Sequence, residues 1–408
     1  MTLLTSNDYM AKEDKFGAHN YHPIPVVLSK GEGIYVWDVE GKKYFDFLSA
    51  YSAVNQGHCH PKITKALTDQ ANTLALTSRA FYNNVLGDWE EYMTKLFGYD
   101  RMLPMNSGAE ADETALKLIR KWAYKVKGIP INEAKILVCE GNFHGRTITI
   151  VSMSSDPDAY NHYGPYTPGF VHIPFNDTER LEEELKKPNV AGFLVEPIQA
   201  EAGVFVPDIG YLKKAADLCK KYNVLFAADE VQTGLGRTGK LLACDHENVR
   251  PDILILGKAL SGGVYPVSCV LANNEIMLTI KPGEHGSTYG GNPIAARVAM
   301  AALDVIQDEN LVENSSRMGE IFRREMKKVD SKMIEIVRGK GLLNAIAVTP
   351  NNGKTAWDVC IRLKENGLLA KPTHEHIIRF TPPLIITEPE LMEAIEIIKR
   401  TFREFEDL

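Results

Sequence analysis

Several features are scarce in this sequence of 408 residues, and each scarcity excludes a class of protein. No run of apolar residues approaches the roughly 20 that a helix needs to cross a bilayer, so we expect no association with a membrane. Lysine and arginine number 46 against 53 acidic residues, which gives a net charge of −7. This balance argues against nucleic acid or an anionic lipid surface as the main partner.

Cysteine is also sparse. The six cysteines include no pair at C-x-x-C spacing, and we interpret them as small buried side chains of a protein in a reducing compartment. The first twenty residues lack a positively charged stretch followed by an apolar core, and they are acidic as well as basic, unlike a transit peptide. We therefore expect a cytoplasmic protein, or a mitochondrial one if a leader has been removed.

Short apolar segments alternate with amphipathic helical patterns from about residue 105 onward. The segments "KILVC", "GFLVEP", "LFAAD" and "DILIL" predict strands of a mostly parallel sheet that is covered on both faces by helices. The last third differs, because "LLNAIAV" and "IIRF" predict strands around a turn and residues 387–405 predict a long helix. The sequence therefore predicts an α/β fold with a second, smaller α+β unit.

Lys258 directly follows the predicted strand "DILIL". Burial at a strand end disfavours the charged ammonium and leaves a neutral amine that attacks carbonyl groups. Asp229 ends the predicted strand "LFAAD", and ligands bind beyond the carboxyl ends of such strands. An aspartate beside a reactive lysine suits the protonated ring nitrogen of pyridoxal phosphate. Each residue alone has a plainer interpretation, a lysine that reaches solvent and an aspartate in a structural ion pair.

Three loops contain further candidates. The loop "NSGAEADET" opens a helix with small residues whose N–H groups suit a phosphate, or it is simply a helix cap. The loop "HGSTYGGNP" offers hydroxyl groups to a phosphate, or merely turns the chain. In "EGNFHGRT", Phe143 can stack on a flat ring or fill the core, and His144 has the pattern of an ordinary loop histidine.

These segments occur in an order that resembles a known family. The segments "NSGAEADETALK", "NFHGRT", "EPIQAEAGV", "ADEVQTGLGRTG", "GKALSGG" and "GSTYGGNP" are similar to the motifs of class III aminotransferases of fold type I, over nearly the whole chain. Further segments, "GIYVWDVEGKKYFDF", "LTIKPGEHGSTYGGNP", "RGKGLLNAI" and "NGLLAKPTH", resemble the branch of this family that acts on ornithine.

The resemblance implies an architecture. A large domain would contain a mostly parallel sheet of the seven-stranded type flanked by helices, and a small α+β domain would follow it. We place an N-terminal segment at residues 1–51, associated with the small domain and a dimer interface, a large cofactor-binding domain at 52–309 and the small domain at 310–408. Two copies would form a homodimer with shared active sites.

The resemblance also implies roles for individual residues. Lys258 would bond covalently to pyridoxal phosphate, and Asp229 would hold the proton of its ring nitrogen. The other cofactor contacts would come from Ser107, Gly108, Ala109, Phe143, His144, Gln232, Ser287 and Thr288, with Thr288 supplied by the neighbouring subunit. The substrate would be bound by Tyr21, Tyr51, Arg146, Glu196, Glu201 and Arg379. No metal is expected.

The implied reaction transfers the δ-amino group of L-ornithine to 2-oxoglutarate, giving L-glutamate 5-semialdehyde and L-glutamate. Another ω-amine, such as acetylornithine or 4-aminobutyrate, is the alternative within the family. An aminomutase and a non-enzymatic binding protein are alternatives on the same fold, and the presence of Lys258 together with Asp229 argues against the binding protein. Without the resemblance, Arg379 has the pattern of a structural ion pair and Arg146 that of a surface arginine.

Overall fold

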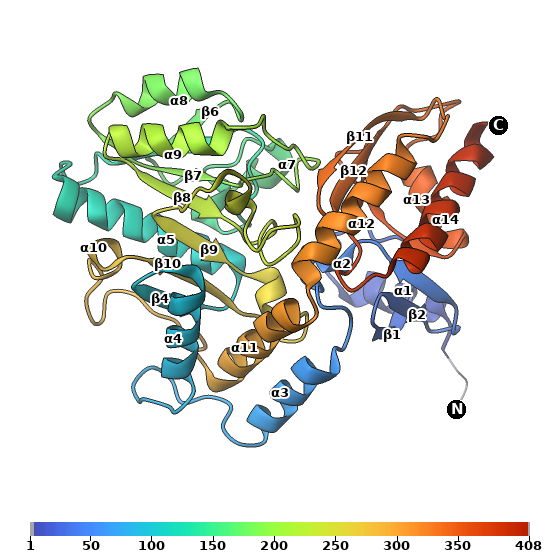
Figure 1. Ribbon diagram of the computed structural model, residues 1–408, viewed down its shortest axis with the longest axis horizontal. Helices are drawn as coiled ribbons and strands as arrows, with labels where there is room; N and C mark the ends of the chain where they lie inside the picture. The colour runs from blue at the N-terminus through green and yellow to red at the C-terminus, as the bar shows by residue number, and fades with distance from the viewer. Residues whose placement is uncertain (1–3, 407–408) are drawn as a thin grey trace.

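A seven-stranded sheet organises the larger of two lobes in the computed structural model, which describes residues 4–406 (Figure 1). Its strands are β4 (Arg101–Met105), β5 (Lys135–Cys139), β6 (Phe170–Ile173), β7 (Val190–Val195), β8 (Leu225–Asp229), β9 (Ile253–Leu256) and β10 (Ser268–Ala272). They lie in the order β4-β10-β9-β8-β7-β5-β6, and only β10 runs antiparallel to its neighbours. The predicted fold class, an α/β protein with a mostly parallel sheet, is confirmed.

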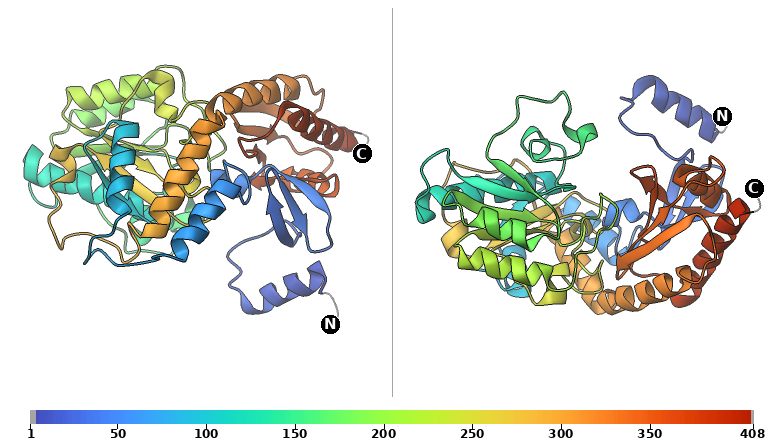
Figure 2. Two further views of the ribbon diagram at one scale, coloured as in Figure 1. Left: turned by 60° about the horizontal axis from the view of Figure 1, so that its bottom comes forward. Right: turned by 90° about the horizontal axis from the view of Figure 1, so that it is seen from above.

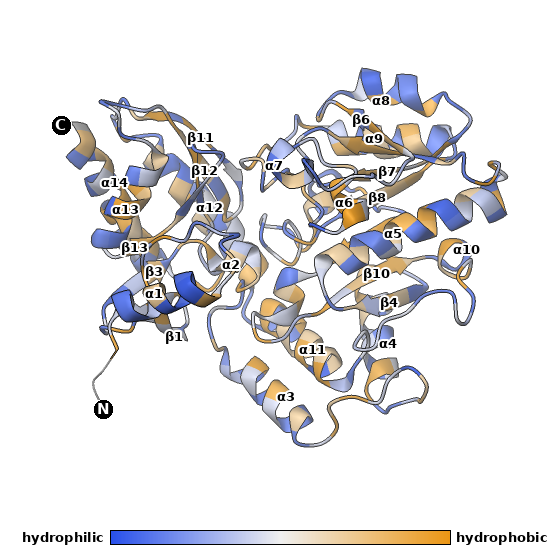
Figure 3. Ribbon diagram, turned by 180° about the vertical axis from the view of Figure 1, so that it is seen from behind, coloured by the Kyte–Doolittle hydropathy of each residue, from blue (hydrophilic) through white to orange (hydrophobic). Residues whose placement is uncertain are grey.

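Helices cover both faces of this sheet because its strands are apolar on both sides. One face packs against α5 (Gly108–Trp122), which buries Ala111, Ala115, Leu118 and Trp122. The opposite face packs against α8 (Thr178–Leu185) and α9 (Tyr211–Lys221). Figure 3 shows α8 as largely hydrophilic on its outer side, as expected for a helix that faces solvent there.

The smaller lobe contains two four-stranded sheets. One has the order β1 (Leu28–Glu32), β2 (Tyr35–Asp38), β3 (Lys43–Asp46) and β13 (Leu368–Leu369). The other has the order β11 (Ile334–Lys340), β12 (Leu343–Val348), β15 (Ile377–Phe380) and β14 (Lys371–Thr373). Because β3 pairs with β13, strands from the two ends of the chain share one sheet. The helices of this lobe are α12 (Leu311–Met326), α13 (Ala356–Glu365) and α14 (Glu388–Glu406).

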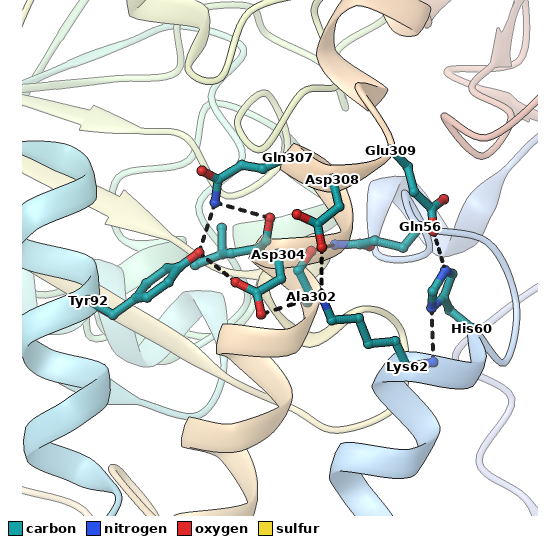
Figure 4. Close-up of polar contacts among 10 residues, drawn as sticks. Gln56, His60, Lys62, Tyr92, Ala302, Asp304, Gln307, Asp308 and Glu309 are labelled. Carbon is teal, nitrogen blue, oxygen red and sulfur yellow. Dashed lines mark hydrogen bonds and ion pairs between the residues drawn. The ribbon is translucent and has the colours of Figure 1, made fainter.

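Helix α11 (Pro293–Asp308) leads from the larger lobe to the smaller one, where α12 follows it (Figure 2). Figure 4 shows the polar contacts that join it to α3 (Pro61–Ala71) and α4 (Leu86–Phe97). Lys62 lies 2.7 Å from Asp308, and the Tyr92 hydroxyl donates to Asp304 over 3.0 Å. Such partly exposed contacts are each worth under about 1 kcal/mol, so the apolar face of α11 contributes most of the packing energy.

The remaining elements are short or lie at the surface. They are α1 (Ser6–Phe16), α2 (Ser49–Ser52), α6 (Ile148–Val151), α7 (Pro157–Tyr160), α10 (Asn274–Met277), the 3-10 turns Ala243–Glu247 and Lys258–Ser261, and the π-helical turn Ala123–Lys127. Helix α1 buries none of its side chains, and its first residue, Ser6, donates two hydrogen bonds to Glu40 of the smaller lobe (Figure 2). Within the described part of the chain, every helix is too short or too polar to span a bilayer.

Candidate active site

Strands β8 and β9 place Asp229 and Lys258 at the same edge of the large sheet. The two strands pair in parallel with Asp229 opposite Ile255, and Lys258 follows β9 by two residues. The backbone of Lys258 has a φ of 42°, in the left-handed region that is strained for a residue with a side chain. Burial lowers the pKa of Lys258, although the charge of Asp229 opposes this effect. Lys258 is therefore a desolvated amine on a strained stretch of backbone.

Asp229 is oriented by donors on both of its carboxylate oxygens. The N–H of Val231 donates to Oδ1 over 2.9 Å, and Nδ1 of His144 lies 2.7 Å from Oδ2. Burial acts to lower the pKa of His144, but the hydrogen bond and charge of Asp229 outweigh it, so this pKa lies above its ordinary value. The result is a buried aspartate, 5% exposed, whose carboxyl group is held in a fixed orientation at the site.

A cavity of about 170 Å³ opens between these side chains. It is lined by Gly108, Ala109, Asp112, Phe143, His144, Gly145, Glu196, Asp229, Val231, Gln232, Thr233 and Lys258. A second cavity, of about 370 Å³, shares Gly108 and Lys258 and reaches Ser107. A larger groove, of about 1030 Å³, lies elsewhere, between the N-terminal ends of α12 and α14, and its lining includes none of the predicted site residues. Asp229, Lys258 and the predicted cofactor contacts near them therefore line the two smaller cavities.

The N-terminus of α5 opens onto both cavities. Ser107 begins this helix with a capping box, in which its hydroxyl accepts from the Glu110 N–H and Glu110 accepts from the Ser107 N–H. The cap fixes the first turn, where free N–H groups and the helix dipole favour an anion. Because Ser107, Gly108 and Ala109 line the cavities, this turn is suited to bind a phosphate group beside Lys258.

A second polar cluster forms where the smaller lobe meets this edge. Arg379, on β15, is 2% exposed, and its guanidinium lies 2.7 Å from Glu201. It also lies 4.9 Å from the centre of the Tyr51 ring, and burial raises the pKa of Tyr51. The charges of Glu201 and Arg379 both act on the pKa of Lys258, so this cluster lies within electrostatic reach of the lysine. A carboxylate-binding arginine therefore stands within electrostatic reach of the reactive amine.

Four predicted site residues lie outside these two groups. Tyr21 is 70% exposed, with the Lys371 ammonium 5.8 Å from its ring centre. Arg146 is exposed at the rim, 5.6 Å from the ring of Phe143. Ser287 accepts a 2.7 Å hydrogen bond from Asn106, whereas the exposed Thr288 lines neither cavity. The prediction that Thr288 contributes to the site of a neighbouring subunit concerns a second chain, so this single chain does not test it.

One protein family matches almost the entire chain. Residues 16–402 match the family model described as aminotransferase class-III. The chain belongs to the class-III aminotransferases.

Curated relatives of this aminotransferase are similar over nearly its full length. Mitochondrial ornithine aminotransferase of Drosophila melanogaster is 65% identical over 96% of this chain and 90% of its own length. Mitochondrial ornithine aminotransferase of Rattus norvegicus is 61% identical over 98% of this chain and 91% of its own.

Solved structures give the same family but two activity names. The ornithine aminotransferase of Toxoplasma gondii, described with partial occupancy of pyridoxal phosphate at its active site, has a TM-score of 0.98 and 50% identity, and the match covers 100% of this chain and 96% of that one. The acetylornithine aminotransferase of Elizabethkingia anophelis has a TM-score of 0.90 and 60% identity, over 98% of this aminotransferase and 99% of that chain. The names differ in the donor amine.

Sequence reasoning missed Asp112, which lines the cavity of this aminotransferase. Its carboxyl lies 3.8 Å from His144, and burial together with the charge of Asp229 raises its pKa well above the ordinary value. The available signal was its position on α5, four residues after Gly108 and hence on the same helix face. Glu196, whose backbone partner is the Phe143 N–H, was predicted only through the family resemblance.

Proposed function

We propose that this aminotransferase binds pyridoxal phosphate between Asp229 and Lys258 and transfers the δ-amino group of L-ornithine to 2-oxoglutarate. The products are L-glutamate 5-semialdehyde and L-glutamate. The observation that carries the proposal is the desolvated Lys258 at one strand end with Asp229, oriented by two donors, at the next. The curated relatives at 61% and 65% identity support ornithine as the donor.

The residues around the cavity fit the cofactor. When bound, pyridoxal phosphate supplies a ring that accepts the electrons of the bond being cleaved. Asp229 would hold the proton on the ring nitrogen, and the first turn of α5 would bind the phosphate. Phe143 would pack on the ring and Gln232 would bind its hydroxyl group.

Lys258 acts twice in this mechanism. Its amine would hold the cofactor covalently at the aldehyde carbon. As a free amine, Lys258 would be placed to take the proton from the reacting carbon of the substrate. Burial suits both tasks, because a lowered pKa leaves more of the amine uncharged near neutral pH.

The Glu201–Arg379 pair selects the end of the substrate that reacts. With ornithine, Arg379 stays bonded to Glu201, and Arg146 with Tyr21 holds the α-amino acid end, so that the δ-amine points to Lys258. With 2-oxoglutarate, Glu201 releases Arg379, which takes the α-carboxylate in a bidentate contact. The fixed carboxylate then places the keto carbon at the reacting position.

Acetylornithine is the second candidate donor, because the structure from Elizabethkingia anophelis is 60% identical to this chain. The two candidates differ at the α-amine, which is charged in ornithine and neutral in its acetylated form. The experiment adds each amine to the cofactor-loaded protein and follows the visible absorption of the bound cofactor. Ornithine should convert it at a higher kcat/KM and yield glutamate semialdehyde, and a preference for acetylornithine would contradict the proposal.

We also propose a homodimer in which Thr288 of each subunit completes the phosphate site of the other. Three large aromatic side chains on loops of the larger lobe support an interface, since Phe81, Tyr82 and Tyr289 are 73%, 104% and 52% exposed in the single chain. Exposed aromatic groups of this kind are common at protein interfaces. Light scattering behind a sizing column should give twice the 45.5 kDa chain mass.

For the compartment, we propose the cytoplasm. All six cysteines are free and five of them are buried, which suits a reducing environment. The relatives in Drosophila melanogaster and Rattus norvegicus carry "mitochondrial" in their names, so the mitochondrial matrix is the alternative. Subcellular fractionation of the source cells distinguishes the two.

A further inference from the structure

Arg237 is a completely buried cation on the loop that follows β8. A guanidinium removed from water ordinarily pairs with a carboxylate, because its desolvation is costly. Arg237 instead donates to neutral acceptors, the carbonyls of Leu342 (3.0 Å) and Pro382 (2.7 Å) and the Asn55 amide oxygen (2.5 Å). Burial lowers its pKa to about 9, against the weaker opposing charge of Asp46. Apolar side chains would fill this part of the core at a lower cost in free energy than a buried charge does.

The partners of Arg237 belong to segments that carry predicted substrate and cofactor residues. Asn55 lies four residues after Tyr51, and Pro382 lies three residues after Arg379. Arg237 itself lies five residues after Gln232. The segments that carry Gln232, Tyr51 and Arg379 therefore meet at one guanidinium.

Further hydrogen bonds lock this junction. The carbonyl of Arg237 accepts from the Leu342 N–H over 3.1 Å and from the Ser315 hydroxyl over 2.9 Å. Asn55 donates to the Leu235 carbonyl over 3.1 Å, and its own carbonyl accepts from the Leu384 N–H over 2.7 Å. Strand β12 begins one residue after Leu342 and pairs with β15, with Ala345 opposite Arg379. A shift of Arg379 relative to the loop of Asp229 would thus break several bonds to a buried charge.

We propose that Arg237 is a positioning residue that sets the distance between Arg379 and the Lys258–Asp229 pair, and thereby the affinity for the carboxylate of the acceptor substrate. The planar guanidinium holds the three acceptors in fixed directions, which non-directional apolar packing does not. A displacement of about 1 Å at a substrate-binding group can cost on the order of 100-fold in rate. The inference rests on the proposed function, because it assumes that Arg379 binds the acceptor.

The test compares the cofactor-loaded wild type with R237K. Lysine keeps the charge, but its single nitrogen lacks the fork that reaches all three acceptors. We expect the KM for 2-oxoglutarate and the Kd for glutarate, a dicarboxylate that cannot react, to rise about 10- to 100-fold. The rate of the ornithine half-reaction and the absorption of the bound cofactor should change less than threefold, on the order of experimental scatter between variants. Ile346→Val is the matched control, since it lowers stability by removing one buried methyl group of β12 without touching the junction.

The outcomes separate positioning from mere support of the fold. If R237K lowers the melting temperature as Ile346→Val does and leaves glutarate affinity unchanged, the inference is wrong. If R237K yields no folded protein, Asn55→Ser decides the matter. It removes one acceptor of Arg237 and the bond to the Leu235 carbonyl, but it leaves the bonds of Arg237 to the Leu342 and Pro382 carbonyls, and it should weaken glutarate binding selectively. A wild type that neither binds glutarate nor reacts with ornithine overturns the proposed function instead.

Discussion

Three buried carboxyl groups lie close to Lys258, and their surroundings give them different properties. Asp229 accepts hydrogen bonds on both oxygens, which fix the orientation of its carboxyl group. Glu196 accepts one from the Phe143 N–H, and burial raises its pKa to about 7. Asp112 has an oxygen with no hydrogen-bond partner in the described structure, and burial raises its pKa well above the ordinary value. Hydrogen bonds therefore orient Asp229, whereas burial raises the pKa of both Glu196 and Asp112.

Loss of the Asp229 charge should slow the chemistry while leaving the fold intact. In Asp229→Asn the ring nitrogen of the cofactor loses its anionic partner, so the transition state loses about 2.7–4 kcal/mol, or 10²- to 10³-fold in kcat. Single-turnover kinetics with ornithine measure the effect. The control Asp217→Asn removes a carboxylate paired with Lys213 on the surface and should leave kcat unchanged. A kcat for Asp229→Asn within about fivefold of wild type contradicts the assignment.

Glu196 should make the cofactor-free protein less stable as the pH rises. Because its folded pKa, about 7, exceeds its ordinary value of 4.5, the stabilisation is complete below pH 4.5 and is lost as the pH rises through 7. The Glu196→Gln variant lacks this dependence. Urea unfolding at several pH values should show the wild type losing roughly 3 kcal/mol relative to the variant between pH 4.5 and 7. A difference that stays constant with pH would show that Glu196 is charged in the folded protein.

The short element α2 is an unusual piece of backbone. Its four residues have φ values of 48°, 45°, 60° and 72°, although none is glycine. Left-handed residues with side chains cost roughly 1–2 kcal/mol each. Asp46 holds the start of the turn by accepting from the N–H groups of Leu48 and Ser49. Tyr51 lies in this turn, and its ring packs beside the Arg379 guanidinium. The strained conformation therefore directs the Tyr51 side chain toward Arg379.

Relief of this strain should raise stability. Ala50 is exposed and has a φ of 45°, so Ala50→Gly removes a steric cost that exceeds the entropy cost of glycine, for a gain of up to about 1 kcal/mol. The control Ala71→Gly changes an exposed residue at the end of the right-handed helix α3 and should lower stability. Thermal unfolding measures both. A lower melting temperature for Ala50→Gly would mean that the turn is not strained at this position.

The strands of the large sheet and the start of α5 could be predicted from the sequence, because both have local signals. Apolar runs such as "DILIL" form strands that are buried on both faces, and "NSGAE" contains the capping box. The left-handed turn had no such signal, since it contains neither glycine nor asparagine. In the segment "GLGRTG", Arg237 has the sequence pattern of an ordinary polar loop residue. Its burial depends on Leu342 and Pro382, more than 100 residues away, which no local pattern reveals.

The site as a whole draws on both lobes. Lys258 and Asp229 come from the large sheet, whereas Arg379 comes from a sheet of the smaller lobe, and Tyr51 lies in the segment that follows β3. The ion pair of Glu201 with Arg379 spans 178 residues, and only the family resemblance assigned these two residues to the substrate site. The domain boundaries at residues 51 and 309 stay predictions, as does the contribution of Thr288 from a second chain.

Shared active sites should allow two inactive variants to complement each other. Lys258→Ala lacks the amine, and Thr288→Glu places a negative charge against the phosphate. If Thr288 acts in the neighbouring site, a mixed dimer of the two contains one intact site, and activity returns after subunit exchange. A mixture of Lys258→Ala with Asp229→Asn should stay inactive, because both residues lie in the same site of one chain. Absence of recovery in the first mixture would mean that Thr288 serves its own chain or none.

Borohydride reduction of the protein loaded with pyridoxal phosphate tests most directly whether Lys258 is the reactive amine. Reduction makes the covalent attachment permanent, and peptide mass spectrometry then locates it. Lys258 should carry the cofactor, and the Lys258→Ala protein should carry none. A label on another lysine, or an unlabelled wild type, would contradict the assignment of the cavity between Asp229 and Lys258 as the active site.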